Sequence, residues 1–190
     1  VLTSGKAYSN VFHANGGSAA FSVMANTLRG VYGTDVLLAT ANSFTGSVLQ
    51  ADYNQKMAAS MIMPNGLMSR QRTMTGAELK ETVRAFVEGC EGGFVPFNRG
   101  SLPVVSGIAV EVKEANGSYT LTGITRNGQP LGDGDTVTVT CLATEKQMEA
   151  LLASDSGTSA GEDTWVKNTW RDYISGGAAL AEPENYMTLR

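Results

Sequence analysis

Several segments of the chain carry hydrophobic residues every three or four positions, which is the spacing of one face of a helix. The clearest case begins at Thr75, where Glu78 follows three residues later and the apolar positions then keep to one face. This is the pattern of a capping box, in which each side chain accepts a hydrogen bond from the other residue's backbone N–H. The pattern predicts helices over residues 19–31 (behind Ser18), 55–61, 75–89 and 144–153, and a last helix capped by Asp163.

Other segments alternate apolar and polar side chains, or form short apolar runs, as strands do. The longest alternation, VVSGIAVEVK, predicts one strand over residues 104–113. Further along, the pair Asn127-Gly128 favours a type I′ hairpin turn, because both positions tolerate a positive φ. The strands expected from these patterns cover residues 36–41, 67–74, 104–113, 118–126 and 136–142.

Together these elements predict an α+β (mixed α/β) fold, with helices packed on a mixed sheet. At 190 residues the chain is long enough for one domain with a substantial core, and its 22 glycines indicate many turns. We therefore expect a single domain over residues 1–190. Within it, the sequence indicates a flexible leader over residues 1–17 and a flexible surface segment over residues 154–162.

Charge and hydropathy exclude two kinds of partner. The formal net charge is −4, from 14 basic and 18 acidic residues, and the basic residues form no cluster. A nucleic-acid-binding surface needs such a cluster, so no nucleic-acid partner is expected. No apolar run approaches the roughly 20 residues that span a bilayer, so no membrane span is expected. Because the chain begins with Val1, we interpret it as a mature product or an excised piece of a longer protein.

Residues able to carry catalysis are few. His13 is the one histidine, and Cys90 and Cys141 lie far apart, so neither a zinc site nor a Ser-His-Asp triad is indicated. The two cysteines are either buried thiols or a disulfide, and the sequence leaves both open. Asp133 and Asp135 fit a hairpin turn. Motifs alone therefore do not indicate an enzyme that works by itself.

The order of several short motifs does resemble a known family. TGAELKE begins at Thr75, PVVSGIAVEV follows a glycine-rich loop, and RNGQPLGDGDTVTV comes next. GVYGTDVLLATA, MPNGLMSRQRTMTGAELK and WRDYISGG with ENYMTLR also keep the expected order and spacing. Together they resemble the carboxy-terminal, substrate-binding domain of the 5′-nucleotidase and UDP-sugar hydrolase family, in a divergent form.

This resemblance implies that catalysis and substrate binding belong to two different domains. In the family, a separate amino-terminal metallophosphoesterase domain holds two divalent metals and hydrolyses the substrate. The carboxy-terminal domain holds the nucleoside and stacks its base between two phenylalanines. The resemblance thus implies no cofactor in this chain, a nucleoside or nucleotide ligand, and an amino-terminal metallophosphoesterase domain as partner. It also implies an exported protein, at the periplasm, the cell surface or outside the cell.

The residues that match the family's ligand-binding positions are substituted. Its N-G-G-G-I-R loop falls on TANSFT, so Thr40 replaces the asparagine and Thr45 replaces the arginine. Asn65 replaces one stacking phenylalanine, and the other falls near Thr144. Stacking on an aromatic ring contributes about 1–3 kcal/mol per base in single-stranded nucleic acids, so these losses would weaken binding strongly.

A different pocket is also conceivable from the sequence, built by Phe44, Phe97 and Arg99, although loop aromatics more often fold onto a core. We therefore hold two main hypotheses. The chain is the nucleotide-recognition domain of a 5′-nucleotidase-like hydrolase, not catalytic by itself. Alternatively, it is a degenerate binding or structural module at the cell surface that has lost nucleotide recognition. An unrelated enzyme with an unrecognised site is a third, weaker hypothesis.

Overall fold

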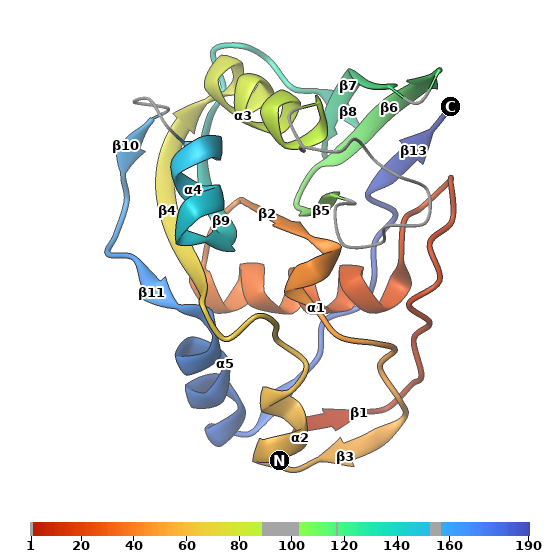
Figure 1. The fold of residues 1–190 in the computed structure, drawn as a ribbon, viewed down its shortest axis with the longest axis vertical. Coiled ribbons are helices and arrows are strands. Elements are labelled where there is room, and N and C mark those ends of the chain that lie inside the picture. Colours follow the sequence, from red (N-terminus) through yellow and green to blue (C-terminus); the bar gives the residue numbers. More distant parts are fainter. Residues whose placement is uncertain (1, 89–102, 117, 153–156) are drawn as a thin grey trace.

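A computed structural model of the chain describes residues 2–88, 103–116, 118–152 and 157–190, which form three mixed sheets and the helices around them (Figure 1). The central, six-stranded sheet has the order β10-β4-β9-β2-β5, and β11 also pairs with β4. Its strands are β2 (Val36–Thr40), β4 (Leu67–Thr75), β5 (Pro103–Ser106), β9 (Thr136–Thr144), β10 (Thr158–Ser159) and β11 (Thr164–Trp165).

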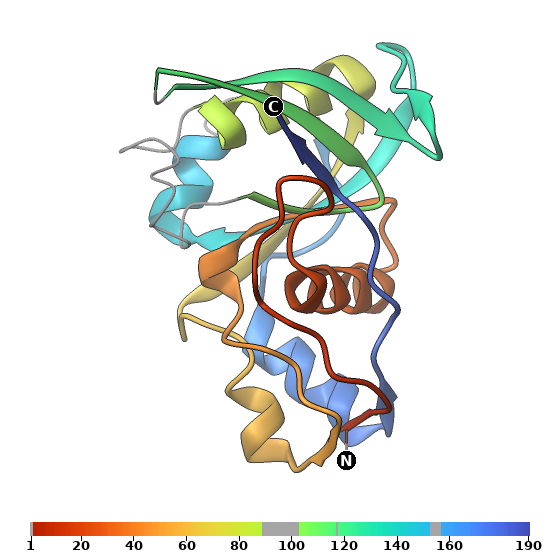
Figure 2. The ribbon, with the colours of Figure 1, turned by 90° about the vertical axis from the view of Figure 1, so that its right-hand side faces the viewer.

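Two smaller sheets lie at opposite ends of the molecule (Figures 1 and 2). The four-stranded sheet has the order β13-β6-β7-β8, and the three-stranded sheet has the order β12-β1-β3. The first contains β6 (Ala109–Ala115), β7 (Ser118–Arg126), β8 (Gln129–Pro130) and β13 (Met187–Leu189). The second contains β1 (Leu2–Ser4), β3 (Ala51–Tyr53) and β12 (Ala178–Ala179).

Helices fill the spaces between the sheets. The longest helix, α1, packs against β2 and β5, while α3 packs against β7 and β4 (Figure 2). Below α1 in Figure 1, α2 and α5 pack on each other next to the three-stranded sheet. The α+β class expected from the sequence is therefore confirmed. The helices are α1 (Ala19–Tyr32), the short 3₁₀ helix η1 (Ala41–Ser43), α2 (Gln55–Ala59), α3 (Gly76–Glu88), α4 (Glu145–Leu151) and α5 (Val166–Ser175).

The capping box at the start of α3 is confirmed. The backbone N–H of Thr75 donates to Glu78 Oε2 at 2.7 Å, and the backbone N–H of Glu78 donates to Thr75 Oγ1 at 3.2 Å. Two of the four N–H groups that a helix start leaves unpaired are satisfied in this way. The apolar face of α3 is buried as the spacing predicts, through Leu79, Val83, Phe86 and Val87.

The single strand expected over residues 104–113 is wrong. The chain instead bends at Gly107, which has a φ of 82°, so that β5 stays in the central sheet and β6 enters the four-stranded sheet. A Cβ atom at Gly107 would lie 2.0 Å from the carbonyl oxygen of Asp35. Only glycine permits both this backbone conformation and this approach, and neither requirement is visible in the alternation of the sequence.

The start of the last helix is also corrected. Asp163 does not cap α5, because its carboxylate accepts from the guanidinium of Arg70, with Nη2 to Oδ2 at 2.7 Å and Nε to Oδ2 at 3.0 Å. Residues 164 and 165 are drawn into β11, antiparallel to β4. The helix therefore begins at Val166, and Arg70 is half-buried in an ion pair.

The two segments expected to be flexible take part in the sheets. Leu2 is fully buried in β1, which lies between β12 and β3, and Gly16 donates its N–H to the carbonyl of Met187 at 2.7 Å. The burial of Leu2 thus holds the start of the chain in a sheet, where the sequence predicts a flexible leader. In the segment 154–162, Thr158–Ser159 forms β10 against β4, while residues 154–156 lie outside the described residues.

Cys141 is a buried free thiol in β9. Cys90 lies outside the described residues, so a bridge between the two cysteines stays an open expectation. Desolvation by burial raises the pKa of the Cys141 thiol to about 12, because the surrounding core disfavours the thiolate.

We expect Gly107→Ala to lower the free energy of unfolding by about 2–4 kcal/mol, since the new Cβ meets the Asp35 carbonyl and the positive φ disfavours alanine. Gly30→Ala is the matched control. Gly30 lies in α1 with open space around its Cα, so alanine there should raise stability by up to about 1 kcal/mol. Urea unfolding of both variants measures the difference, and equal effects would contradict the account of the bend.

A second prediction concerns Cys141. In a Cys90→Ser background at pH 8, we expect a maleimide or disulfide reagent to modify the native protein about 10³-fold more slowly than the urea-unfolded protein. The reason is that a thiol whose pKa is about 12 is almost wholly protonated, whereas an unfolded cysteine is partly ionised at this pH. Similar rates in the two states would show that Cys141 is accessible in the native fold.

Candidate functional site

Three of the four positions that match the family's ligand-binding residues lie at one edge of the central sheet. β2 and β9 run parallel, with Leu38 aligned to Cys141, so their carboxyl ends reach the same edge. These ends are Thr40 and Thr144. The antiparallel strand β4 starts at this edge, where Leu67 pairs with Thr144, and Asn65 precedes it by two residues. We call this the carboxyl edge.

The fourth position, Thr45, lies in the loop that follows η1 and is held by the segment that follows α2. Its hydroxyl donates to the carbonyl of Ser60 at 2.5 Å, and its backbone N–H donates to the carbonyl of Met61 at 3.1 Å. Phe44 beside it is only 5% exposed and packs against Phe21, with 6.1 Å between ring centroids. Phe44 is therefore a core residue, and it does not offer a ring face to a ligand.

The polar groups of Asn65 and Thr144 already have protein partners. Asn65 Oδ1 accepts from the ammonium of Lys167. The N–H and hydroxyl of Thr144 both reach Gln147 Oε1, at 3.1 and 3.0 Å, and so open α4 in the manner of a capping box. A ligand at the carboxyl edge would have to compete with these bonds or add to them.

The remaining members of the alternative pocket, Phe97 and Arg99, lie outside the described residues, as does Phe94. The alternative pocket thus stays a prediction, and its one described member, Phe44, is buried.

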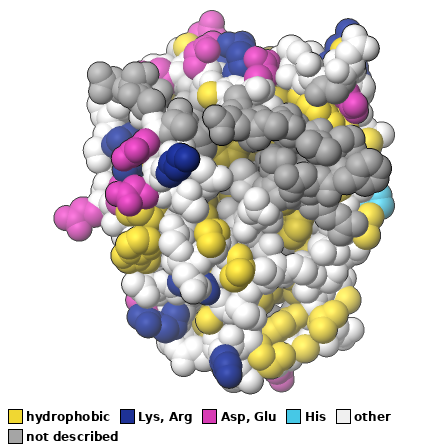
Figure 3. Space-filling view, in the orientation of Figure 1, with side chains coloured by type: hydrophobic (Ala, Val, Ile, Leu, Met, Phe, Trp, Pro, Cys, Tyr) yellow, Lys and Arg dark blue, Asp and Glu magenta, His cyan; other side chains and the backbone are white. Residues whose placement is uncertain are grey.

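One aromatic residue at the carboxyl edge escaped the sequence reasoning. Trp165 is 49% exposed in β11, where it pairs with Met68 at the start of β4. Hydrophobic side chains reach the surface in this region of the molecule (Figure 3). The sequence suggests two core tryptophans, and Trp170 is indeed fully buried, donating its indole N–H to the carbonyl of Ala58 at 2.8 Å. Trp165 was missed because we interpret it from the sequence, like Trp170, as a core residue.

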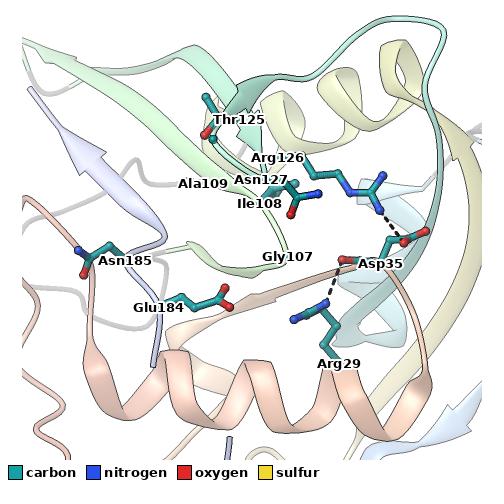
Figure 4. A pocket seen from close by; sticks show the side chains of 11 residues that line it. Arg29, Asp35, Gly107, Ile108, Ala109, Thr125, Arg126, Asn127, Glu184 and Asn185 are labelled. Carbon is teal, nitrogen blue, oxygen red and sulfur yellow. Dashed lines mark hydrogen bonds and ion pairs between the residues drawn. The ribbon is translucent and has the colours of Figure 1, made fainter. Parts of the chain in front are cut away.

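At the opposite, amino end of β2, Asp35 joins the two larger sheets. Its Oδ2 accepts from the N–H and the hydroxyl of Thr138 in β9, both at 2.9 Å. Its Oδ1 accepts from Arg126 Nη2 in β7 at 2.6 Å (Figure 4). The backbone hydrogen bond from Thr138 is the largest cause that lowers the pKa of Asp35, and partial burial opposes it. Asp35 is therefore ionised at neutral pH.

Metal ligands do not gather in the described part of the chain. No group of three or more His, Cys, Asp or Glu side chains there is placed to hold a metal ion. His13 forms an isolated bridge with Gly17 on the surface. The two metals implied by the family resemblance would belong to another domain. Separately, no described helix is long and apolar enough to cross a bilayer.

Solved structures of other proteins have a similar fold. A 5′-nucleotidase precursor from Thermus thermophilus superposes with a TM-score of 0.67 at 13% identity, and covers 100% of this chain and 39% of its own. The NAD nucleotidase of Haemophilus influenzae gives 0.66 at 17% identity, with 100% of this chain and 37% of its own covered. The chain has a fold found in 5′-nucleotidases.

The match extends beyond nucleotidases. A sulfate thiohydrolase, SoxB, from Thermus thermophilus superposes with a TM-score of 0.63 at 13% identity, over 88% of this chain and 31% of its own. No family model matches the sequence, and no curated protein matches it. The resemblance expected from the motif order is thus confirmed for the nucleotidase-like fold. This chain spans less than two fifths of the length of each of these structures.

Asp35 should make stability depend on pH. A carboxyl group whose pKa is lowered by folding stabilises the protein fully above its unfolded value near 4, and this contribution fades as the pH falls through the folded pKa. We expect Asp35→Asn to be less stable than wild type at pH 7, and the gap to shrink below about pH 4. Asp172→Asn, an exposed carboxylate in α5, is the control. A gap that is constant with pH would contradict the role of the carboxylate.

Proposed function

We propose that this chain is the substrate-recognition domain of a nucleotidase-like hydrolase and holds the nucleoside part of a nucleotide at the carboxyl edge. The observation that carries the proposal is the meeting of Thr40, Asn65 and Thr144 at one edge of a nucleotidase-like fold, beside the exposed indole of Trp165. Ligands of sheet proteins commonly bind outside the carboxyl ends of parallel strands.

The chemistry available at this edge suits a nucleotide. The indole of Trp165 presents an apolar face on which any nucleobase can stack, which is the interaction that single-stranded nucleic-acid binders use. Lys167, two residues later, contacts Asn65 and brings a positive charge to the same place, where it would favour a phosphate. The aromatic face and the cation thus come from residues other than the four substituted positions.

Hydrolysis itself would be the work of another domain. The nucleotidases of this fold are more than twice as long as this chain, and the described residues offer no metal-binding group. We propose that an amino-terminal metallophosphoesterase domain with two divalent metals completes the enzyme. The protein would then act on nucleotides outside the cytoplasm, in the periplasm, at the cell surface or beyond it.

A degenerate binding or structural module is the second candidate, and the internal hydrogen bonds of the edge favour it. Thr45 is bonded to Ser60, Thr144 opens α4, and Phe44 is buried in the core. Residues at these positions stabilise the fold without any ligand. The SoxB match also shows that the fold is not restricted to proteins named as nucleotidases.

The two candidate functions predict different results when the chain is titrated with AMP, uridine nucleotides and UDP-sugars and followed by calorimetry and thermal unfolding. The recognition domain should show saturable binding, and a ligand at 100 times its Kd should add about 2.7 kcal/mol of stability. Trp165→Ala should weaken binding at least about tenfold, while Trp165→Phe should keep most of it, because a ring face remains.

Leu49→Ala is the matched control, since Leu49 is another exposed apolar residue but lies in the loop before β3. It should leave the affinity unchanged. Absence of binding at millimolar nucleotide would overturn the recognition proposal in favour of the degenerate module. An affinity that does not change in Trp165→Ala would show that the ligand binds away from β11.

A further inference from the structure

A second site lies on the amino side of the central sheet, opposite the carboxyl edge. It is a cavity of about 390 Å³ at the amino end of β2, next to Asp35, which precedes this strand (Figure 4). Its walls are the last turn of α1, the bend between β5 and β6, the turn between β7 and β8, and the segment that leads into β13. This volume falls in the range of small-molecule sites.

One wall carries a guanidinium that the fold holds in place. Arg29 Nε donates to Ser106 Oγ at 2.8 Å, and Nη1 lies 3.5 Å from the carbonyl oxygen of Asp35. Ser106 in turn donates to Asn26 Oδ1, and Asn26 Nδ2 donates to the carbonyl of Glu182 at 2.8 Å. Because Ser106 and Asn26 are buried, this chain of bonds fixes the orientation of Arg29 before any ligand arrives.

The guanidinium keeps donors for a ligand. Within the described parts of the chain, Arg29 Nη2 makes no hydrogen bond to protein, and Arg126 bonds only through Nη2, to Asp35. Asp35 is occupied by Thr138 and Arg126, and its charge offsets that of Arg126. Among the described residues Arg29 forms no ion pair within 4 Å, although its charge also acts on the nearby Asp35 carboxylate.

The opposite wall carries a carboxylate. Glu184 is anchored through its backbone, whose N–H donates to Ser22 Oγ at 2.8 Å and whose carbonyl accepts from the same hydroxyl at 2.9 Å. Figure 4 shows its carboxylate directed into the space between this segment and Arg29. Among the described residues no cation lies within 4 Å of the carboxylate, although Arg29 lines the same cavity. Opposite charges thus face each other across an open gap.

We propose that this cavity binds a small zwitterion of the amino-acid class. Its carboxylate would accept from Arg29 and Arg126, and its ammonium would donate to Glu184. A cation held in place and a carboxylate that does not pair with it directly are both satisfied by one molecule that carries the two complementary charges. The walls are mainly polar, and the side-chain amide of Asn127 adds a further hydrogen-bonding group. This site is independent of the carboxyl edge and of the nucleotide proposal.

The charge requirement can be tested by NMR titration of the ¹⁵N-labelled chain with glycine, β-alanine and γ-aminobutyrate, which separate the two charges by increasing lengths. Propionate and propylamine each carry one of the charges. We expect saturable shifts at the amides of Gly107, Ala109 and Asn127 with at least one zwitterion. Its Kd should be at least about tenfold lower than those of the two singly charged probes.

Two variants separate the roles of the walls. Arg29→Gln should abolish the saturable shifts. Glu184→Gln, at an exposed position that leaves the backbone anchor intact, should make the best-binding zwitterion bind no better than propionate. Arg84→Gln and Glu81→Gln, which remove the same charges from α3, should change nothing.

Three results would overturn the proposal. They are shifts that do not saturate with any zwitterion, propionate binding as tightly as the best-binding zwitterion, and a Glu184→Gln variant that binds that zwitterion with wild-type affinity. The second result would identify an anion site in place of a zwitterion site.

Discussion

The close approach of Gly107 to Asp35 is the constraint on which the arrangement of the sheets depends. The Asp35 carbonyl occupies the place that a side chain at residue 107 would need. Because glycine has no Cβ, the chain can bend there, leave the central sheet and enter the four-stranded sheet. The carboxylate of the same residue bonds to Thr138 in one sheet and Arg126 in the other. A single residue thus joins both sheets through its backbone and its side chain, and it also forms part of the wall of the cavity.

Local signals in the sequence predict much of the fold. Ser18 and Gly33 bound α1, Thr75 and Glu78 open α3, and both Asn127 and Gly128 have the positive φ of a type I′ turn. These features depend on residues near one another in sequence, so the pattern alone contains them.

The errors all arise from contacts between distant segments. Alternation runs without a break through VVSGIAVEVK, and the bend at Gly107 depends on Asp35, which is remote in sequence. The capping role expected for Asp163 is lost to Arg70, and the expected leader is held by the burial of Leu2. In the same way, Arg29, Asn127 and Glu184 meet in one cavity only after folding, and no motif connects them.

For the candidate site, the resemblance names positions, and their contacts become visible only in the fold. The family resemblance singled out Thr40, Asn65 and Thr144, and the fold places these three residues at a common edge of the central sheet. What these residues do there depends on their neighbours. Thr144 opens a helix, Asn65 contacts Lys167, and Trp165 is exposed because β11 delays the start of α5. The contacts of Asn65 and Trp165 are tertiary, so substitution patterns do not record them, whereas the Thr144 cap is local.

The most direct test of the account is native-state hydrogen exchange of the backbone amides in the two larger sheets. If Asp35 and Gly107 hold the sheets together as one unit, Val110 and Val112 in β6 should open with the same free energy as Val139 in β9, close to that of global unfolding. Exchange of the β6 and β7 amides at a clearly lower free energy, while β2 and β9 stay protected, would show that the four-stranded sheet opens by itself and would contradict the account.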